Sequence, residues 1–578
     1  MSEVKSQSKQ ELETLRHSAS HILAQAVKRL FPEAKLGIGP PIKDGFYYDF
    51  EIDGDIISKN LSRIEEEMKK IVKEDIPFEK KIITKEEAKK LFENLNEPYK
   101  IELLEEIPDS KVTIYKQGEF VDLCRGPHVE TTGKVKHFAL LSVAGAYWKG
   151  KEGNPMLSRI YGTCFFTENE LKNYLEWLEK AKQQDHRKIG RELEIFEIYP
   201  ELGAGLAIYH PKGCIIREII EEFEKKEHLK RGYQLVRTPH ISRAQLWRTS
   251  GHLDFYRENM YVFSINGEEY VIKPMNCPAH IMVYKSKQRS YRELPLRFFE
   301  LGTVYRREAS GVLHGLLRLR GFTQDDAHIF CMPSQLVEEV REVLKFSLFM
   351  METFHLGYKI TLSTRPEKSI GSDISWEKST SALKKALEEE NLDFEVAEGE
   401  GAFYGPKIDI QMEDALGRLW QGPTIQVDFN LPERFDLNYV APDGEKKRVV
   451  MIHRVVLGAI DRFLGVLIEH LGGKFPLWLA PVQVKILTVT DKEIPFASKI
   501  HQKLTEEEIR TELDIKNEML SYKIRQAQLE KVPYMIIIGK KEVSSQKITV
   551  RTREGDNIKN ITIEEFLDKI KQEIACRK

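Results

Sequence analysis

Apolar and polar residues are distributed differently in three parts of the chain, and each pattern predicts its own kind of domain. In residues 1–187, apolar positions recur at helical spacing from Leu12 to Leu30, and Pro32 should end that helix. Short alternating segments follow, namely GFYYDFEID, KVTIYKQGEFVDL and HFALLSVAGAYW. An α+β domain is therefore predicted, followed by a charged linker helix in ENELKNYLEWLEKAKQQDHRKIGRELEIF.

Residues 188–479 carry longer alternating runs between helical segments. FFELGTVYRRE, LRLRGFTQDDAHIF, KIDIQMED and IQVDFN indicate a mainly antiparallel sheet rather than regular βαβ repeats. Residues 480–578 instead alternate strand-like runs (VKILTVT, TELDI, YMIIIG, KITVRTR) with helical ones, which is typical of a small α/β domain with parallel strands. The chain is expected to be an α+β multidomain protein.

Composition narrows the class of protein without naming a function. The 578 residues hold 88 basic and 90 acidic side chains, a net charge of −2, so overall charge does not argue for a nucleic-acid partner. No apolar run approaches the roughly 20 residues that span a membrane, and the polar N-terminus does not resemble a signal peptide. Six scattered cysteines without CxxC spacing argue against a disulfide framework. We expect a cytoplasmic protein with no membrane partner.

Polar residues interrupt the strand-like segment GFTQDDAHIFC at regular intervals. Because side chains alternate along a strand, one face should carry an aromatic ring, an amide, a carboxylate and an imidazole: Phe322, Gln324, Asp326 and His328. A ligand lying along that face could meet all four. The alternative is a buried strand with one satisfied polar cluster.

Other segments contribute further residues that could bind a ligand or a metal. In YRRE, Arg306 offers a planar fork for a phosphate, and Glu308 could accept from an amino group. Cys277 lies in a proline-flanked turn, VIKPMNCPAH, and MIHRVVLGAIDRFLGVLIEH is predicted as one helix that carries His453 and Arg462. Cys277 and two histidines could converge on one zinc ion with an open fourth position, although no short motif links them.

These segments resemble class II aminoacyl-tRNA synthetases, and within that class the bacterial-type threonyl-tRNA synthetases. LKRGYQLVRTPHI is similar to motif 1, RFFELGTVYRREASGVLHGLLRLRGFTQDDAHIF to motif 2 and GAIDRFLGVLIEH to motif 3. KPMNCPAH, GAFYGPKIDI and WQGPTIQVDF resemble segments specific to the threonine enzymes. The likeness covers nearly the whole chain and begins close to Met1, so we expect a member without the extra N-terminal domain of many relatives. Asp461 departs from the glutamate that usually precedes the motif 3 arginine.

The resemblance implies that threonine is activated with ATP and Mg²⁺ and transferred to tRNA(Thr) by an antiparallel-sheet catalytic domain, residues 188–479. Arg306 would bind the α-phosphate and Glu308 the adenine amino group, while Phe322 and Arg462 would sandwich the adenine. His252, in RTSGHLDFY, matches a family histidine that assists the transfer; a hydrogen-bonded loop histidine is the alternative.

The same resemblance implies one zinc ion on Cys277, His328 and His453. In the family, zinc binds the amino and hydroxyl groups of threonine, which rejects valine because valine offers no hydroxyl. Asp326 would pair with the substrate ammonium. The residues implied to lie near it are Gln324, Tyr404 and Gln426.

Two pairs of ligand-type residues mark residues 1–187. His17 and His21 are four apart on the predicted helix and share a face, and VDLCRGPH supplies Cys124 and His128. The pairs make a metal or hydrolytic site plausible, and they resemble the family's editing domain, which removes serine from tRNA. Serine differs from threonine by one methyl group, worth only about 1–3 kcal/mol, so a second hydrolytic site is needed. Asp122 is assigned to this site, and its metal content is left open.

Residues 480–578 resemble the family's anticodon-binding domain. By that likeness Asn517, Glu542 and Arg551 would read anticodon bases; solvated surface residues are the alternative. Motif 1 commonly builds a dimer interface in this class, so a homodimer is expected.

The alternative functions are a non-catalytic RNA-binding paralogue and a neighbouring synthetase such as the prolyl or seryl enzyme. Intact Arg306, Glu308 and Arg462 and the three zinc-type ligands speak against the paralogue. The zinc-type set and the HxxxH and CxxxH pairs of residues 1–187 speak against another synthetase.

Overall fold

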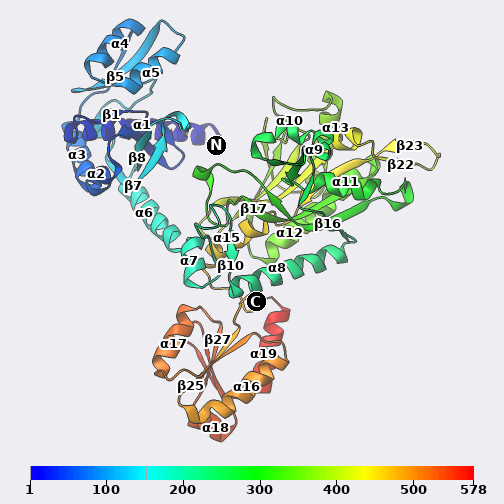
Figure 1. The fold of residues 1–578 in the computed structure, drawn as a ribbon. Coiled ribbons are helices and arrows are strands. Elements are labelled where there is room, and N and C mark those ends of the chain that lie inside the picture. Colours follow the sequence, from blue (N-terminus) through cyan, green and yellow to red (C-terminus); the bar gives the residue numbers. More distant parts are fainter. Residues whose placement is uncertain (1, 152, 578) are drawn as a thin grey trace. The chain divides into compact units, whose positions relative to one another are not determined.

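The computed structural model describes residues 2–151 and 153–577, which divide into two compact units (Figure 1). The first unit ends at Lys180 and the second begins at Ala181. Among the described residues, no helix combines the length and apolarity needed to cross a membrane.

A long helix packed on a sheet forms the core of the first unit. Helix α1 (Ser2–Leu30) buries Ala19, Ile22 and Leu23 against the sheet, which confirms the helix predicted in this segment. The sheet order is β1-β3-β8-β7, with β2 beside β3. The bounds are β1 (Lys35–Leu36), β2 (Pro41–Ile42), β3 (Gly45–Glu51), β7 (His137–Tyr147), β8 (Met156–Phe165), α2 (Gly54–Lys59) and α3 (Leu61–Glu74).

A smaller three-stranded sheet completes this unit. Its strands β4 (Glu79–Thr84), β5 (Lys111–Gln117) and β6 (Phe120–Leu123) are antiparallel, and α4 (Lys85–Asn94) and α5 (Pro98–Glu106) accompany them. The β5–β6 hairpin positions Asp122 and the segment that follows it. The charged segment predicted as one linker helix forms two, α6 (Glu168–Gln183) and α7 (His186–Glu192). Asp185 starts α7 by accepting a hydrogen bond from the Arg187 N–H.

An eight-stranded sheet organises the second unit, in the order β11-β16-β17-β24-β21-β20-β18-β19. The six central strands are antiparallel and only the two edge pairs are parallel, which confirms the prediction of a mainly antiparallel sheet. The bounds are β11 (Gln234–Leu235), β16 (Leu296–Tyr305), β17 (Gly321–Cys331), β18 (Gly357–Ser363), β19 (Glu395–Ala397), β20 (Lys407–Glu413), β21 (Leu419–Asp428), β24 (Val450–Val455), α8 (Pro211–Lys230), α12 (Leu336–Thr353), α13 (Asp373–Glu389) and α15 (Ile460–Leu471).

His453 does not lie on a helix, as the sequence had suggested, but on strand β24. The segment from Met451 to His470 is a strand, a turn and helix α15, with Gly458 in the left-handed region at φ 93°. β-Branched residues favour the strand, and a glycine is suited to that turn conformation. Arg462 does lie on the helix, in its first turn.

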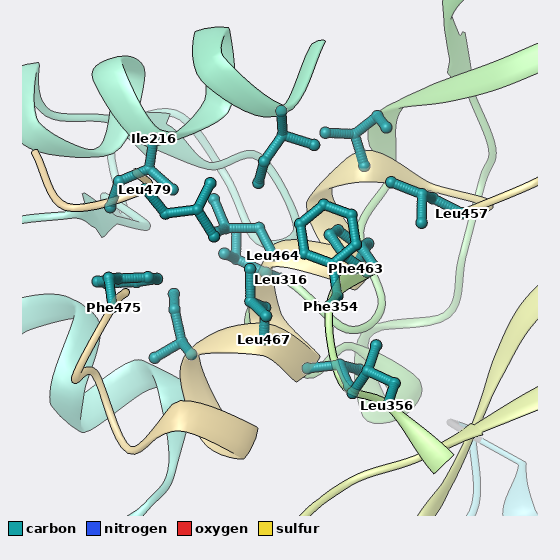
Figure 2. Packing of buried hydrophobic residues seen from close by; sticks show 14 of the residues in the cluster. Ile216, Leu316, Phe354, Leu356, Leu457, Phe463, Leu464, Leu467, Phe475 and Leu479 are labelled. Atoms are coloured by element: carbon teal, nitrogen blue, oxygen red, sulfur yellow. The ribbon is translucent and has the colours of Figure 1, made fainter. Parts of the chain in front are cut away.

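Several apolar clusters pack the second unit around this sheet, and two of them bear on the position of β17. One joins α15 to the loop before β17, and Figure 2 shows Leu316 of that loop among Phe463, Leu464 and Leu467. The other contains Ala327 and Ile329 of β17. That face of β17 is therefore buried in the core, and the opposite face remains for polar residues.

The last part of the second unit is a five-stranded sheet in the order β26-β25-β27-β28-β29. The three strands β25, β26 and β27 are parallel, as predicted, but β28, in KITVRTR, runs antiparallel to β27. The bounds are β25 (Val484–Thr488), β26 (Thr511–Asp514), β27 (Tyr534–Ile538), β28 (Ile548–Thr552), β29 (Asn557–Ile561), α16 (Ile494–Glu506), α17 (Leu520–Leu529), α18 (Lys540–Ser545) and α19 (Ile563–Ala575).

Candidate functional site

A pocket of about 360 Å³ lies on the polar face of β17. All four residues predicted to share that face line it, and so do residues from several distant segments of the chain. The predicted residues that meet in the pocket are Cys277, Arg306, Phe322, Gln324, Asp326, His328, Tyr404, Gln426, His453 and Arg462. The pairing of strands far apart in sequence brings them together.

Strand register explains why an imidazole pair and an amide lie side by side. His328 on β17 is paired with His453 on β24, and His453 is paired with Gln426 on β21. Side chains at paired positions point to the same face of a sheet. The Tyr404 hydroxyl donates to Gln426 Oε1 at 2.5 Å, which fixes the amide from the neighbouring loop.

Cys277, His328 and His453 form a buried set whose ligand atoms all lie within 4.8 Å of one another. His328 Nδ1 lies 2.8 Å from His280 Nδ1, and His453 Nε2 lies 2.9 Å from Asp428 Oδ2. These partners leave His328 Nε2 and His453 Nδ1 for a metal. One thiolate and two imidazoles held by outer hydrogen bonds suit zinc with an open position.

The carboxylate of Asp326 is held beside this set. Its Oδ2 accepts a hydrogen bond from Asn276 Nδ2 at 2.9 Å. Burial raises the pKa of Asp326, while nearby His280 and the Asn276 bond oppose the rise. The Asn276 amide lies over Gly302 of β16, where a Cβ would come within 2.4 Å of its nitrogen. A glycine at 302 therefore makes room for the residue that orients Asp326.

Two arginines make the other end of the pocket positive. The Arg306 guanidinium carbon lies 5.2 Å from the Phe322 ring centre, and its Nε donates to the Pro274 carbonyl. Arg462 donates from Nε to the Leu317 carbonyl at 3.0 Å. Burial, then the charge of Arg306, lowers the pKa of Arg462. An aromatic ring and two guanidinium groups that line one end of a pocket suit a nucleotide.

The aspartate that departs from the usual motif 3 residue is fully bonded inside the protein. Asp461 Oδ2 accepts from the Thr323 main-chain N–H at 2.8 Å. Its Oδ1 accepts from the Tyr209 hydroxyl at 2.6 Å and from Arg217 at 2.8 Å. The shorter side chain thus ties α15 to β17 and α8.

Glu308 and His252 are not among the pocket-lining residues. The Glu308 carboxylate accepts from Arg318 at 2.9 Å. His252 is buried, with Nδ1 2.8 Å from Ser250 Oγ and Nε2 3.1 Å from Met275 Sδ. Burial lowers its pKa to about 3, so the ring is neutral. Their predicted contacts with adenine and with the transferring group remain predictions.

A second cluster in the first unit contains His17, His21, Cys124 and His128, whose ligand atoms also lie within 4.8 Å of one another. Cys124 Sγ is 3.3 Å from His17 Nε2 and 3.2 Å from His128 Nε2. Burial lowers the pKa of all three histidines and raises that of Cys124 to about 12. The cluster is therefore a protonated thiol among neutral imidazoles, whose unprotonated ring nitrogens can accept hydrogen bonds.

Asp122 joins this cluster through a buried network that sequence reasoning missed. Tyr48 donates its hydroxyl to Asp122 Oδ2 at 2.6 Å, and Lys100 Nζ lies 2.5 Å from Asp122 Oδ1. His21 Nε2 lies 3.6 Å from the same carboxylate. Tyr48 and Lys100 come from β3 and α5, and nothing in their local sequence indicates a partner on β6.

The three residues predicted to read the anticodon have different surroundings. Glu542 accepts from the Gly539 N–H at 3.0 Å and from the Thr549 hydroxyl at 2.8 Å, so its carboxylate caps α18. Arg551 lies on β28, with Nη1 3.4 Å from Asn557 Oδ1. Asn517 is exposed ahead of α17. Their contact with RNA remains a prediction.

Some supporting residues of the pocket could have been found in the sequence. Asp428 follows Gln426 by two residues on a strand, so both point to one face. His280 follows Cys277 by three on α11 (Cys277–Lys285), so both lie on one helical face.

Comparisons with known proteins agree with this geometry. Residues 261–471 match the family model of the tRNA synthetase class II core domain (G, H, P, S and T). Residues 483–573 match an anticodon binding domain, and residues 112–161 match the threonyl and alanyl tRNA synthetase second additional domain. The resemblance noted in the sequence is thereby confirmed.

Relatives that match over most of their length indicate the same family. The chain is 55% identical over 567 residues to the threonine–tRNA ligase of Citrifermentans bemidjiense, covering 98% of this chain and 89% of that protein. It is 56% identical to the threonine–tRNA ligase of Dehalococcoides mccartyi, with 94% of both chains covered. A threonyl-tRNA synthetase structure from Cryptosporidium parvum, described as its RNA binding domain, aligns with a TM-score of 0.65 and 38% identity over 67% of this chain and 98% of that one.

The antiparallel sheet with its pocket, the anticodon-binding domain and the second additional domain define a class II aminoacyl-tRNA synthetase. Within that class, 55% sequence identity to threonine–tRNA ligases over nearly the whole chain decides the family. The chain belongs to the threonine–tRNA ligase family.

Proposed function

We propose that the chain activates threonine with ATP and transfers it to tRNA(Thr). The observation that carries this proposal is one pocket that joins a metal-type set to a carboxylate on one side and to paired arginines on the other. The metal-type set and the carboxylate suit an amino acid, and the arginines suit the phosphates of a nucleotide. The activation reaction needs the two ligands side by side. Family membership supports the same reaction.

Cys277, His328 and His453 would hold zinc, and the fit rests on their donor types, burial and fixed tautomers. Zinc bound there would supply a Lewis acid with an open position for the amino and hydroxyl groups of threonine. The protein itself would pair Asp326 with the ammonium and orient the substrate through Gln426, Tyr404 and Gln324. A β-branched analogue without the hydroxyl would leave polar groups unpaired.

At the other end, Arg306 and Arg462 would neutralise the phosphates of ATP as charge develops during attack by the threonine carboxylate. Phe322 and Arg462 would sandwich the adenine ring, and both residues line this pocket. Glu308 would accept from the adenine amino group if its pairing with Arg318 opens. Mg²⁺ would accompany ATP, and His252 would assist transfer to the tRNA.

The cluster of His17, His21, Cys124 and His128 would hydrolyse seryl-tRNA(Thr), with Asp122 fixing His21. Support comes from neutral imidazoles next to a polar network, and from the match to the second additional domain. Asn517, Glu542 and Arg551 are proposed to meet the anticodon, because they belong to the matched anticodon binding domain.

A homodimer is proposed through the motif 1 region. Large apolar side chains are exposed on and around α8 and β11, among them Leu202, Leu206, Ile208, Leu229 and Leu235. Light scattering of the purified chain would give twice the monomer mass if this surface pairs with a second copy. We propose a cytoplasmic location for this protein, because translation in the cytoplasm uses aminoacyl-tRNA.

The test is amino-acid-dependent ATP–pyrophosphate exchange with threonine, serine, valine and proline, with and without a zinc chelator. Strong exchange with threonine, weaker exchange with serine and none with valine would support the pocket assignment, as would loss of exchange on zinc removal. No exchange with any of the four would contradict the reaction. Equal exchange with valine would contradict the role given to the metal-type set.

A further inference from the structure

His186, the first residue of α7, is fully buried and contacts both helix α15 and the loop that precedes β17. Figure 1 shows α7 close to α15. His186 Nδ1 lies 2.6 Å from Glu469 Oε1 on α15, and His186 Nε2 accepts from the Leu316 main-chain N–H at 3.0 Å. A backbone N–H can only donate, so the ring proton lies on Nδ1 and is donated to Glu469. Both ring nitrogens are thereby used, and His186 has no free nitrogen for a metal.

The bond to Leu316 holds a loop that also contacts the nucleotide end of the pocket. The next residue, Leu317, accepts the Arg462 Nε–H on its carbonyl at 3.0 Å. The loop is therefore held at two peptide groups, 315–316 by His186 and 317–318 by Arg462, with one peptide group between them. Both leucine side chains are buried in the cluster around α15, where Figure 2 shows Leu316.

The contact between ring and loop leaves no spare room. Gly315 adopts φ 48°, and a Cβ there would lie 2.1 Å from His186 Nε2. On the other side, Glu469 is held by its second oxygen, which accepts from Arg418 at 2.6 Å. The His186 main-chain N–H also donates to Glu469 at 3.1 Å. The imidazole is thus a rigid spacer between α15 and the loop.

We propose that His186 is a positioning residue for the ATP-dependent step. By holding the Leu316 N–H, it sets the Leu317 carbonyl that orients the Arg462 guanidinium in the pocket. His186 does not line the pocket, so it acts through Leu317 and Arg462 rather than on substrate. The inference rests on the role proposed above for Arg462 in nucleotide binding.

The experiment compares His186→Asn and His186→Gln in the full-length protein by ATP–pyrophosphate exchange. Asparagine keeps a polar group near the Nδ1 position but cannot reach Leu316, whereas the glutamine amide extends toward the Nε2 position. Loss of one buried hydrogen-bond acceptor should raise the KM for ATP about tenfold in His186→Asn, with the KM for threonine unchanged. His186→Gln should recover part of the loss.

His228→Asn is the matched control, because His228 is also fully buried in the second unit but stacks on Phe299 and does not contact the loop. If His186→Asn folds poorly, Gly315→Ala disturbs the same contact without removing a polar group, and the same selective rise in the KM for ATP is expected. Equal changes in both KM values, matched by His228→Asn, would overturn the proposal.

Arg462→Ala separates this proposal from the function on which it rests. If that variant leaves the KM for ATP unchanged, the nucleotide role of Arg462 is wrong, and the positioning role of His186 is overturned with it. If Arg462→Ala raises the KM for ATP but neither His186→Asn nor Gly315→Ala does, only the positioning role is overturned.

Discussion

Asp325 and Asp326 are consecutive residues of β17, but their carboxylates lie on opposite faces of the sheet and make different contacts. Asp326 lines the pocket and accepts from Asn276. Asp325 is fully buried and accepts three main-chain N–H bonds, from Val456 at 2.6 Å, Leu457 at 3.0 Å and Gly458 at 2.8 Å. One carboxylate faces the pocket, and the other holds the turn from which α15 starts.

Replacing Asp325 should therefore lower the stability of the fold, whereas replacing Asp326 should mainly affect the reaction. Asp325→Ala leaves three buried N–H groups without an acceptor, so we expect the free energy of unfolding to fall by about 3 kcal/mol. Asp325→Asn keeps one oxygen acceptor and should lose less. Urea unfolding measures both. Asp326→Asn provides the control: it should abolish threonine-dependent exchange with a smaller change in stability, and the reverse ranking would contradict this division of roles.

Local alternation was sufficient to predict the pocket face of β17, because four of its residues follow one strand period. The same reasoning placed His453 on a helix, since the apolar run around it fits either structure until the Gly458 turn is known. The partners that fix Asp122 could not be predicted: Tyr48 and Lys100 reach it from other elements. Periodicity identifies faces, whereas pairing between distant segments depends on the packing of the whole domain.

Cys277→Ser should remove bound metal and threonine activation together. The thiol supplies the only sulfur of the set, and a hydroxyl is a poor zinc ligand, so metal analysis should show loss of close to one zinc per chain. Exchange with threonine should then be undetectable. Hydrolysis of preformed seryl-tRNA(Thr) should persist, since the cluster around Cys124 that we propose for hydrolysis lies in the first unit. Cys214→Ser, at an exposed cysteine, is the control and should retain both metal and exchange.

Substitutions in the second cluster should separate editing from activation. His17→Ala removes an imidazole 3.3 Å from Cys124, and we expect seryl-tRNA(Thr) hydrolysis to slow by about 100-fold, the usual contribution of a positioned proton acceptor. Threonine-dependent exchange should be unchanged. His137, a histidine of the same unit outside the cluster, gives the control His137→Ala. A parallel loss of exchange would mean that His17 acts through overall folding.

The buried histidines of the first unit should make its stability depend on pH. Burial lowers the pKa of His21 and His128 below the ordinary value of about 6.5, so the unfolded chain binds protons that the folded unit excludes. Stability should be fully present above about pH 6.5 and should fall as the solution is acidified below it. Hydrogen exchange of α1 in the intact chain, followed from pH 7.5 to pH 5 with correction for the intrinsic rate, reports this change. His128→Gln cannot titrate and should show a shallower fall, whereas equal slopes would assign the effect to other groups.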